Sequence, residues 1–464
     1  MGSGFAIVVD VGKTMTKVSL WSREGRMLDR ASRPSASLVI DGRRHLDAPT
    51  IGEFVLEAIG AMATGGVEYI VPVAHGAGVA ALVDGSLALP PLDYEQPLPA
   101  DLLADYRLQR AAFAATGSPA LPDGLNMGAQ LYWLDRLHPA SMAGATLLPW
   151  AQYWAWFMSG VAVSEVTSLG CHSDLWNPAA GTFSSLAVAQ GWADRFAPLA
   201  RAGDVVGQVR PDVANRCGLA PATKVLAGLH DSNAALLAAR GFPQISGGEA
   251  TVLSTGTWFV AMRSTQAALD TAALPEARDC LVNVDVAGRP VPSARFMGGR
   301  EIETLVGIDA RRIDIVPDQP HLLAAVPGLV EAGAMVLPTL TPGCGPFPRA
   351  QGGWISQPDN WFARRAGSSL YAALVADAAL DLIGATDTLL VEGRFAEAQV
   401  LVRALASLRP GTRVYTANAD TDVSFGALRL IDPALVPDGQ LKAVEPLPID
   451  LERYRTQWTG RITT

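Results

Sequence analysis

The chain has 464 residues, more than the roughly 250–300 that usually share one hydrophobic core, so we expect two or three domains. Hydrophobic residues make up 49% of it and charged residues 17%, which excludes a disordered or collagen-like protein. The 45 acidic and 36 basic residues give a net charge of −9 without a clustered basic stripe, which excludes a dedicated nucleic-acid binder.

The first half of the chain alternates between predicted strands and helices. Strands are expected at residues 5–11, 16–21 and 69–74, helices at 50–62, 126–137 and 148–158, and a proline-rich loop at 87–99. A Gly-Lys-Thr turn joins the first two strands. Strands that alternate with helices indicate an α/β domain.

The second half repeats this layout, since it also opens with a strand, a glycine turn and a strand. Its strands are expected at residues 250–254, 258–262, 388–391 and 413–416, and its helices at 369–383 and 397–408; the first half ends with a strand at 225–229 and a helix at 233–239. We predict a duplicated actin/hexokinase-like (ribonuclease H-like) α/β fold with a ligand cleft between the lobes; the alternative is a single large doubly wound fold. The predicted domains are residues 1–242 and 243–464.

The cysteines and the N-terminus indicate the compartment. None of the four cysteines lies in a CxxC pair, which favours a reducing environment without structural zinc. The N-terminus lacks a charged and then apolar leader, and no uncharged run approaches the roughly 20 residues of a membrane span. We therefore expect a cytoplasmic protein that does not bind a membrane.

The first glycine turn has the composition of a phosphate site. In Asp10-Val-Gly12-Lys13-Thr14-Met-Thr-Lys17, backbone amides, hydroxyls and two ammonium groups follow one strand. A carboxylate beside phosphates commonly serves Mg²⁺, so Asp10 is the predicted metal ligand. The alternative is an ordinary hairpin with solvated lysines.

A second turn of small residues opens the second half. Ser254-Thr255-Gly256-Thr257-Trp258 lets the backbone approach an anion closely, and two such turns could grip one polyphosphate. A plain hairpin is again the alternative.

Asp231 is the predicted general base. It ends a short strand and precedes a helix, so its carboxylate could accept a proton from a substrate hydroxyl. The alternative role is a helix N-cap, and the two roles can coexist.

These motifs resemble the FGGY family of carbohydrate kinases in their order and spacing. The resemblance extends over nearly the whole chain. It rests on the two glycine turns, Gly228-Leu-His-Asp231-Ser, Pro338-Thr-Leu-Thr-Pro-Gly343, Leu389–Gln399 and Phe425-Gly-Ala.

The resemblance implies magnesium- and ATP-dependent phosphorylation of a sugar hydroxyl, with sugar held mainly by the N-terminal lobe and nucleotide by the C-terminal lobe. It implies Asp231 as the base and Asp10 near the metal. The phosphate residues would be Gly12, Lys13, Thr14, Lys17, Thr255, Gly256 and Thr257, and the nucleotide residues Gly393, Arg394 and Phe395. Lys13 stands where the family usually has threonine, and residues 343–346 lack the Glu-Arg pair often present there.

The predicted sugar contacts rest only on where these residues lie in the sequence. The predicted residues besides Asp231 are His75, Asp93, Tyr94 and Trp258, with a packed or surface histidine as the alternative for His75. His172 and Asp174 are weaker candidates, for which a solvated loop is the alternative, and we interpret Trp154 and Trp156 as helix core.

The expected substrate is a ketopentose or 6-deoxyketohexose, of the rhamnulose, fuculose, xylulose or ribulose type. The alternative is a catalytically weak regulatory protein that binds sugar or nucleotide on the same fold. The sequence leaves open whether the chain forms a homodimer.

Overall fold

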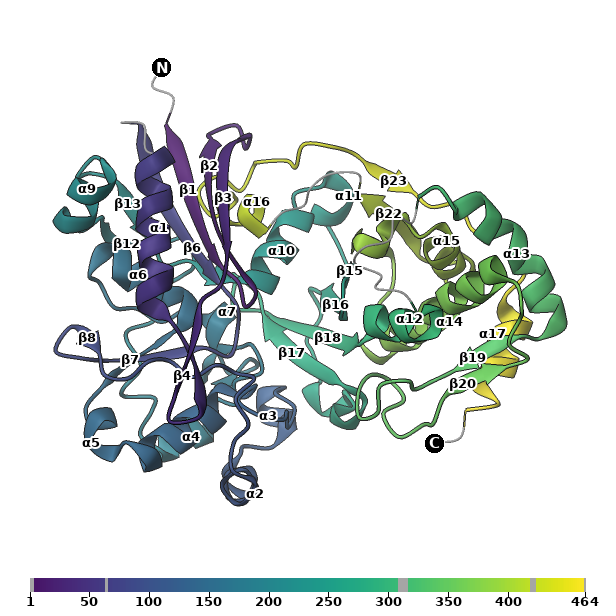
Figure 1. The fold of residues 1–464 in the computed structure, drawn as a ribbon, viewed down its shortest axis with the longest axis horizontal. Helices are drawn as coiled ribbons and strands as arrows, with labels where there is room; N and C mark the ends of the chain where they lie inside the picture. Colours follow the sequence, from purple (N-terminus) through teal and green to yellow (C-terminus); the bar gives the residue numbers. More distant parts are fainter. Residues whose placement is uncertain (1–3, 63–65, 308–315, 418–422, 463–464) are drawn as a thin grey trace. The chain divides into compact units, whose positions relative to one another are not determined.

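The computed structural model describes residues 4–62, 66–307, 316–417 and 423–462, which form two compact units (Figure 1). The first unit contains Met1–Gly241, Val282–Pro290 and Thr421–Asp438; the second contains Phe242–Leu281, Val291–Asp420 and Gly439–Thr464. The chain thus enters the second unit after Gly241 and twice returns to the first.

The first sheet has the strand order β12-β13-β6-β1-β2-β3, and β14 also pairs with β6. Its strands are β1 (Phe5–Val11), β2 (Met15–Ser22), β3 (Met27–Pro34), β6 (Val67–Ala74), β12 (Val205–Gln208), β13 (Lys224–Leu226) and β14 (Leu229–His230). β1, β2 and β3 are antiparallel neighbours, whereas β1, β6 and β13 run parallel.

The second sheet repeats this pattern, with β15 in the place of β1. Its strands are, in order, β17 (Cys280–Val284), β18 (Pro290–Phe296), β16 (Phe259–Ser264), β15 (Ala250–Thr255), β21 (Thr388–Gly393), β22 (Arg413–Ala417) and β23 (Leu441–Ala443). β15 pairs antiparallel with β16 and parallel with β21, which is parallel to β22. The predicted duplicated α/β fold is confirmed.

Helices α1 (Ala48–Met62) and α6 (Trp150–Ser159) contribute to the core of the first unit. Trp154 is fully buried there, against Trp150 and Tyr153, as the sequence predicted. The predicted helix at 148–158 begins only at Trp150, because the preceding residues form β9 (Thr146–Pro149) against β7 (Val79–Val83).

Helix α10 (Asp231–Ala239) packs against α16 (Val423–Leu428), which lies beside it in Figure 1. A Cβ on Gly426 would lie 1.8 Å from the carbonyl oxygen of Ala234, so only glycine permits this approach. The adjacent Phe425 ring meets Trp21 edge-on at 6.4 Å. The C-terminal Phe-Gly-Ala motif therefore supports the helix that Asp231 begins.

The main helices of the second unit are α12 (Gly298–Val306), α13 (Gln319–Ala332), α14 (Trp361–Leu382), α15 (Gln399–Leu408) and α17 (Glu452–Thr459). α14 begins eight residues before the predicted start, since Asn360 caps it by accepting a hydrogen bond from the amide of Ala363 at 3.0 Å. Within the described residues, no helix is both long and apolar enough to cross a membrane.

Shorter elements complete the described fold. In the first unit they are β4 (Ser37–Ile40), β5 (Arg43–Leu46), β8 (Ser86–Leu87), α2 (Ala100–Gln109), α3 (Phe113–Thr116), α4 (Met127–Leu137), α5 (Pro139–Met142), α7 (Val166–Leu169), β10 (Trp176–Asn177), β11 (Thr182–Phe183), α8 (Ser185–Ala189) and α9 (Pro211–Cys217). In the second they are α11 (Pro243–Ser246), β19 (Met335–Leu337), β20 (Gly353–Ile355) and the 3₁₀ turns Thr271–Ala273, Glu276–Arg278 and Arg394–Glu397.

Candidate active site

Three parallel strands of the first unit end at one edge of its sheet. In β1, Asp10 lies opposite Val73 of β6, and in β14, His230 lies opposite Ala74 of β6. The carboxyl ends of parallel strands meet at the same edge, so this register gathers Asp10, His75 and Asp231 there.

Gly228 makes the approach of β14 to β6 feasible. Its φ is +77°, and a Cβ would lie 2.2 Å from the carbonyl oxygen of Pro72. A side chain at this position would push β14, and with it Asp231, away from β6.

Asp231 is the first residue of α10, so it follows the N-cap position instead of occupying it. Its Oδ1 accepts hydrogen bonds from the amide of Ser232 at 2.6 Å and its hydroxyl at 3.2 Å, and lies 3.1 Å from Nε2 of His230. Within the described residues, Oδ2 has no hydrogen-bond partner, and the side chain keeps 30% exposure. One carboxylate oxygen is therefore held while the other can take a proton.

Asp10 is buried and lies 3.3 Å from Nζ of Lys17. Burial raises the pKa of Asp10 to about 6; Lys17 opposes this rise, and the nearby Asp231 carboxylate adds to it. A divalent cation would favour the ionised form of such a carboxylate. The described residues contain no group of three or more His, Cys, Asp or Glu that could hold a metal. A carboxylate oxygen is a ligand that Mg²⁺ accepts, so Asp10 fits an ion whose other ligands are water and nucleotide phosphates.

The first turn presents its backbone between β1 and β2. The amide of Gly12 donates to the carbonyl oxygen of Met15 at 3.1 Å, and the Gly12 carbonyl accepts from the hydroxyl of Ser35 at 2.6 Å. Thr14 is exposed and Lys17 is half-buried. The Thr14 hydroxyl and the Lys17 ammonium are thus placed where an anion could reach them.

Lys13 of this turn points to the segment before α2. Its ammonium forms an ion pair with the buried Asp93, lies 3.5 Å from Oε2 of Glu95, and lies 4.9 Å from the centre of the Tyr94 ring. Two carboxylates already balance its charge. This geometry favours a role for Lys13 in holding the turn around Tyr94, and its phosphate role stays a prediction.

His75 is 6% exposed and packs edge-on against Tyr94, with ring centres 5.3 Å apart. Burial lowers the pKa of His75, which favours the neutral ring. Nδ1 lies 2.7 Å from the carbonyl oxygen of Gly76 and must donate to it, which leaves Nε2 as an acceptor. Asp231 and Asp93 both act electrostatically on His75 and on Tyr94, so these four predicted sugar residues form one cluster.

Asp174 has a structural role that the sequence did not predict. It is 1% exposed and accepts hydrogen bonds from the guanidinium of Arg110 at 3.0 Å and the hydroxyl of Tyr106 at 2.6 Å. The solvated-loop alternative is wrong for this residue. Nδ1 of His172 lies 2.7 Å from the carbonyl oxygen of Leu125.

The second turn joins β15 to β16 in the second unit. The amide of Gly256 donates to the carbonyl oxygen of Trp258 at 3.0 Å, and Thr257 is exposed. Helix α12 begins against this turn, since a Cβ on Gly299 would lie 2.1 Å from the carbonyl oxygen of Gly256. Trp258 belongs to this unit and stacks with the guanidinium of Arg295 at 4.9 Å, so its sugar contact stays a prediction.

The predicted nucleotide residues follow β21 directly. Gly393 has a φ of +82°, and a Cβ there would lie 2.4 Å from the carbonyl oxygen of Thr255. The Thr255 hydroxyl accepts from the amide of Phe395 at 3.0 Å, so it connects β15 with the turn. The Phe395 ring is buried against Phe259, whereas Arg394 is half-buried. The Phe395 ring therefore serves the core.

Glu301 of α12 supports the loop at residues 338–343, a role that the sequence did not reveal. Its Oε1 accepts from the amides of Leu340 and Thr341 at 3.0 and 2.9 Å, and its Oε2 accepts from the hydroxyl of Tyr371 at 2.8 Å. Burial raises the pKa of Glu301. These bonds anchor a loop that lacks the Glu-Arg pair often present in the resembled family.

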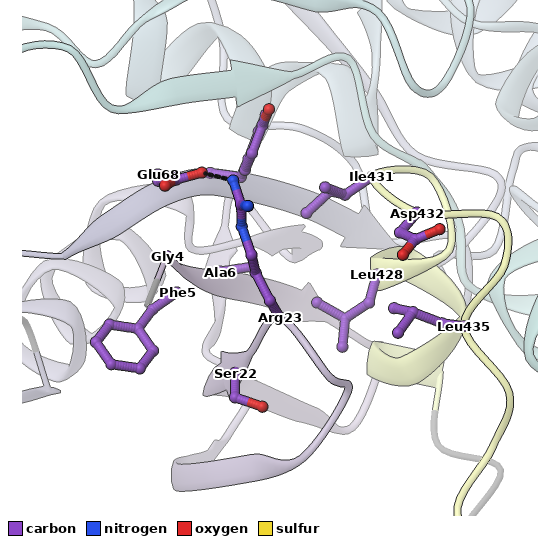
Figure 2. Close-up of a pocket in the computed structure, with 11 residues that line it drawn as sticks. Gly4, Phe5, Ala6, Ser22, Arg23, Glu68, Leu428, Ile431, Asp432 and Leu435 are labelled. Carbon is purple, nitrogen blue, oxygen red and sulfur yellow. Dashed lines mark hydrogen bonds and ion pairs between the residues drawn. The ribbon is translucent and has the colours of Figure 1, made fainter. Parts of the chain in front are cut away.

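A cavity of about 310 Å³ opens at the other end of β1 (Figure 2). Phe5, Leu428 and the exposed ion pair of Arg23 with Glu68 line it. β1 rises roughly 3.3 Å per residue, which puts this cavity on the order of 20 Å from the strand's other end. It is therefore separate from the Asp231 cluster.

Comparisons with known proteins agree with this geometry. Residues 247–438 match the model of the C-terminal domain of FGGY carbohydrate kinases. The crystal structure of a carbohydrate kinase from Novosphingobium aromaticivorans is 65% identical, with a TM-score of 0.96 over 100% of this chain and 99% of that one. A search of curated proteins gave no match.

More distant structures share the fold. A xylulose kinase from Rhodospirillum rubrum has a TM-score of 0.81 at 18% identity, over 98% of each chain. Plasmodium falciparum glycerol kinase with ADP has a TM-score of 0.80 at 10% identity, over 99% of this chain and 96% of that one. Since the Novosphingobium kinase matches along its whole length, the chain belongs to the FGGY family of carbohydrate kinases and is a phosphotransferase that acts on a sugar hydroxyl.

Proposed function

We propose that the chain transfers the γ-phosphate of ATP to a hydroxyl of a small neutral sugar, with Asp231 as the general base. The observation that supports this proposal is the geometry of the Asp231 carboxylate: its Oδ1 is held by three donors, while its Oδ2 has no partner within the described residues. Kinases of this family use ATP, so the donor follows from membership; the acceptor and the base are the proposal.

The chemistry needs one proton acceptor. As the bond between the sugar oxygen and the γ-phosphorus forms, the bond to the β-phosphate oxygen breaks and ADP leaves. The hydroxyl proton passes to Oδ2 of Asp231. Phosphoryl transfer depends on positioning and charge neutralisation more than on covalent help from the protein.

The charge around Asp231 favours a neutral sugar. The ammonium of Lys13 pairs with Asp93 and that of Lys17 with Asp10. A sugar acid would bring its carboxylate toward those of Asp10, Asp93 and Asp231. Among the described groups of this cluster, no ammonium group is left without a carboxylate partner to balance the added charge. A neutral sugar can instead donate a hydroxyl to Nε2 of His75 and rest against the Tyr94 ring.

We propose Asp10 as the residue that positions Mg²⁺. When bound, the ion neutralises the triphosphate and polarises the γ-phosphate. The exposed Thr14, the amides of the first turn and Lys17 would contact the same phosphates from the first unit.

We assign the nucleotide to the second unit. Gly256 and Thr257 would contribute turn amides and a hydroxyl for phosphate, and Thr255 would contribute its backbone because its hydroxyl is already used. Gly393 and Arg394 would lie nearest the nucleoside, and the Phe395 ring would support them from the core.

A panel of acceptors tests this function. Coupled ADP release is measured with ketopentoses, 6-deoxyketohexoses, polyols and aldonates at fixed magnesium. We expect stimulation by a ketopentose or a 6-deoxyketohexose and none by an aldonate. Preference for an aldonate would contradict the charge argument. Thermal stabilisation by a sugar without ADP release would instead support the regulatory protein.

A further inference from the structure

His230 is fixed in place by its backbone as well as by its ring. It is 4% exposed, and its amide donates to the hydroxyl of Thr167 at 3.0 Å. That hydroxyl donates in turn to Oε2 of Glu165 at 2.6 Å, and the same carboxylate oxygen accepts from the amides that begin α7. The fully buried Glu165 thus anchors the end of β14 from a neighbouring element.

The hydrogen bonds of the ring determine its tautomer. Nδ2 of Asn233 lies 3.3 Å from Nδ1 of His230, and because an amide nitrogen only donates, Nδ1 must accept. Burial lowers the pKa of His230, which favours the neutral ring, and with Nδ1 as acceptor this ring carries its one hydrogen on Nε2. Nε2 lies 3.1 Å from Oδ1 of Asp231 and 3.4 Å from Sγ of Cys171. The carboxylate is the stronger acceptor of this hydrogen.

The hydrogen bond to Oδ1 fixes the rotation of the Asp231 carboxylate. Oδ2 therefore stays available to a substrate hydroxyl. Other titratable groups also act on this pair or its anchor: Asp10 on β1, His75 after β6, Tyr94 before α2, Cys171 after α7 and Glu165 before α7.

We propose that His230 is a positioning residue for the base: its Nε2–H donates to Oδ1 of Asp231 and fixes the rotation of the carboxylate, with Oδ2 directed to the acceptor hydroxyl. This rests on the proposed function of Asp231. A histidine that merely fills the core would affect the melting temperature without affecting kcat.

Two amide substitutions separate these roles. In His230→Gln the side-chain amide can reach the position of Nε2, whereas in His230→Asn it reaches only that of Nδ1. Both remove the ring and part of the packing, so each is the control for the other. The measurements are kcat and KM for the accepted sugar, taken separately, and the melting temperature.

We expect His230→Asn to lower kcat by about 10- to 100-fold with little change in KM for the sugar, because the donor to Oδ1 is lost while the sugar contacts remain. His230→Gln should keep most of kcat. Cys171→Ala, which changes a buried neighbour of the same nitrogen, should also keep kcat. Equal kcat values in the two amide variants would overturn the proposal.

Asn233→Ala provides a second route if His230→Asn does not fold. It removes the donor to Nδ1, so the hydrogen can move to Nδ1 and Asp231 loses its partner part of the time. The value of kcat should fall by a smaller factor than in His230→Asn, and an unchanged kcat would contradict the proposed tautomer. If the wild-type enzyme phosphorylates no sugar, the proposed function itself fails; if the wild type is active but His230→Asn and His230→Gln have equal kcat values, this inference alone fails.

Discussion

Replacing Lys13 by methionine removes an ammonium group that faces both Asp93 and Glu95. The side chain of Asp93 is 4% exposed, so its carboxylate would remain buried without this partner. The same substitution keeps most of the apolar stem against the Tyr94 ring. We therefore expect the turn that carries Asp93 and Tyr94 to lose its anchor.

The expected cost is substantial. Breaking a buried ion pair costs about 3–5 kcal/mol, but the Lys13 side chain keeps 19% exposure, so water screens part of the interaction. We expect a loss of about 2–3 kcal/mol, which corresponds to a fall in the melting temperature of roughly 5–10 °C. Because Tyr94 moves with the turn, KM for the sugar should rise, with little change in KM for ATP.

Calorimetry and steady-state kinetics check this, with Lys224→Met as the control. The Lys224 ammonium lies 5.2 Å from the ring of Tyr69, much as Lys13 lies against Tyr94, so the control loses a similar ring contact. In a double-mutant cycle, Lys13→Met and Asp93→Asn should couple by about 1–2 kcal/mol. Normal melting with an unchanged sugar KM would refute this reasoning, and a fall in kcat/KM for ATP alone would support the phosphate role instead.

Three further predictions each concern one residue. Burial raises the pKa of Glu165 to about 7. Ionisation of Glu165 therefore destabilises the folded chain; this effect is complete above pH 7 and absent below the pKa of the unfolded chain. The melting temperature should fall from pH 6 to 8 less steeply in Glu165→Gln than in the wild type. Gly228→Ala should lower stability and activity, because its Cβ would meet the carbonyl oxygen of Pro72. Gly218→Ala is the control, since Gly218 has a similar φ and open space around it; it should lower the free energy of unfolding, measured by chemical denaturation, by only about 1 kcal/mol. Asp10→Asn should raise the Mg²⁺ concentration for half-maximal rate about tenfold in a magnesium titration, and an unchanged requirement would contradict its metal role.

The sequence predicted the features that depend on local pattern. Apolar segments on either side of a glycine turn identified both opening hairpins, and a short apolar run followed by a helix located Asp231 at its junction. The start of α14 was missed because its first turns lie outside the alanine-rich stretch that predicted a helix.

Contacts between distant residues could not be predicted. Lys13 and Asp93 are 80 positions apart, and neither side chain has a local pattern that indicates the pair. The same holds for Glu301, which supports a loop about 40 positions later, and for Gly426, which packs against the helix that Asp231 begins. Each depends on which elements the fold brings together, and one sequence does not encode that locally.

Sugar-dependent ADP release by Asp231→Asn tests the central claim most directly, with Asp101→Asn, an exposed carboxylate in α2, as the control. Asparagine keeps the size of the side chain but cannot accept the hydroxyl proton, so kcat should fall by about 10²–10⁴. Calorimetric sugar affinity and the melting temperature should stay near those of the wild type. Phosphorylation at the wild-type rate by a normally folded Asp231→Asn protein would contradict the account.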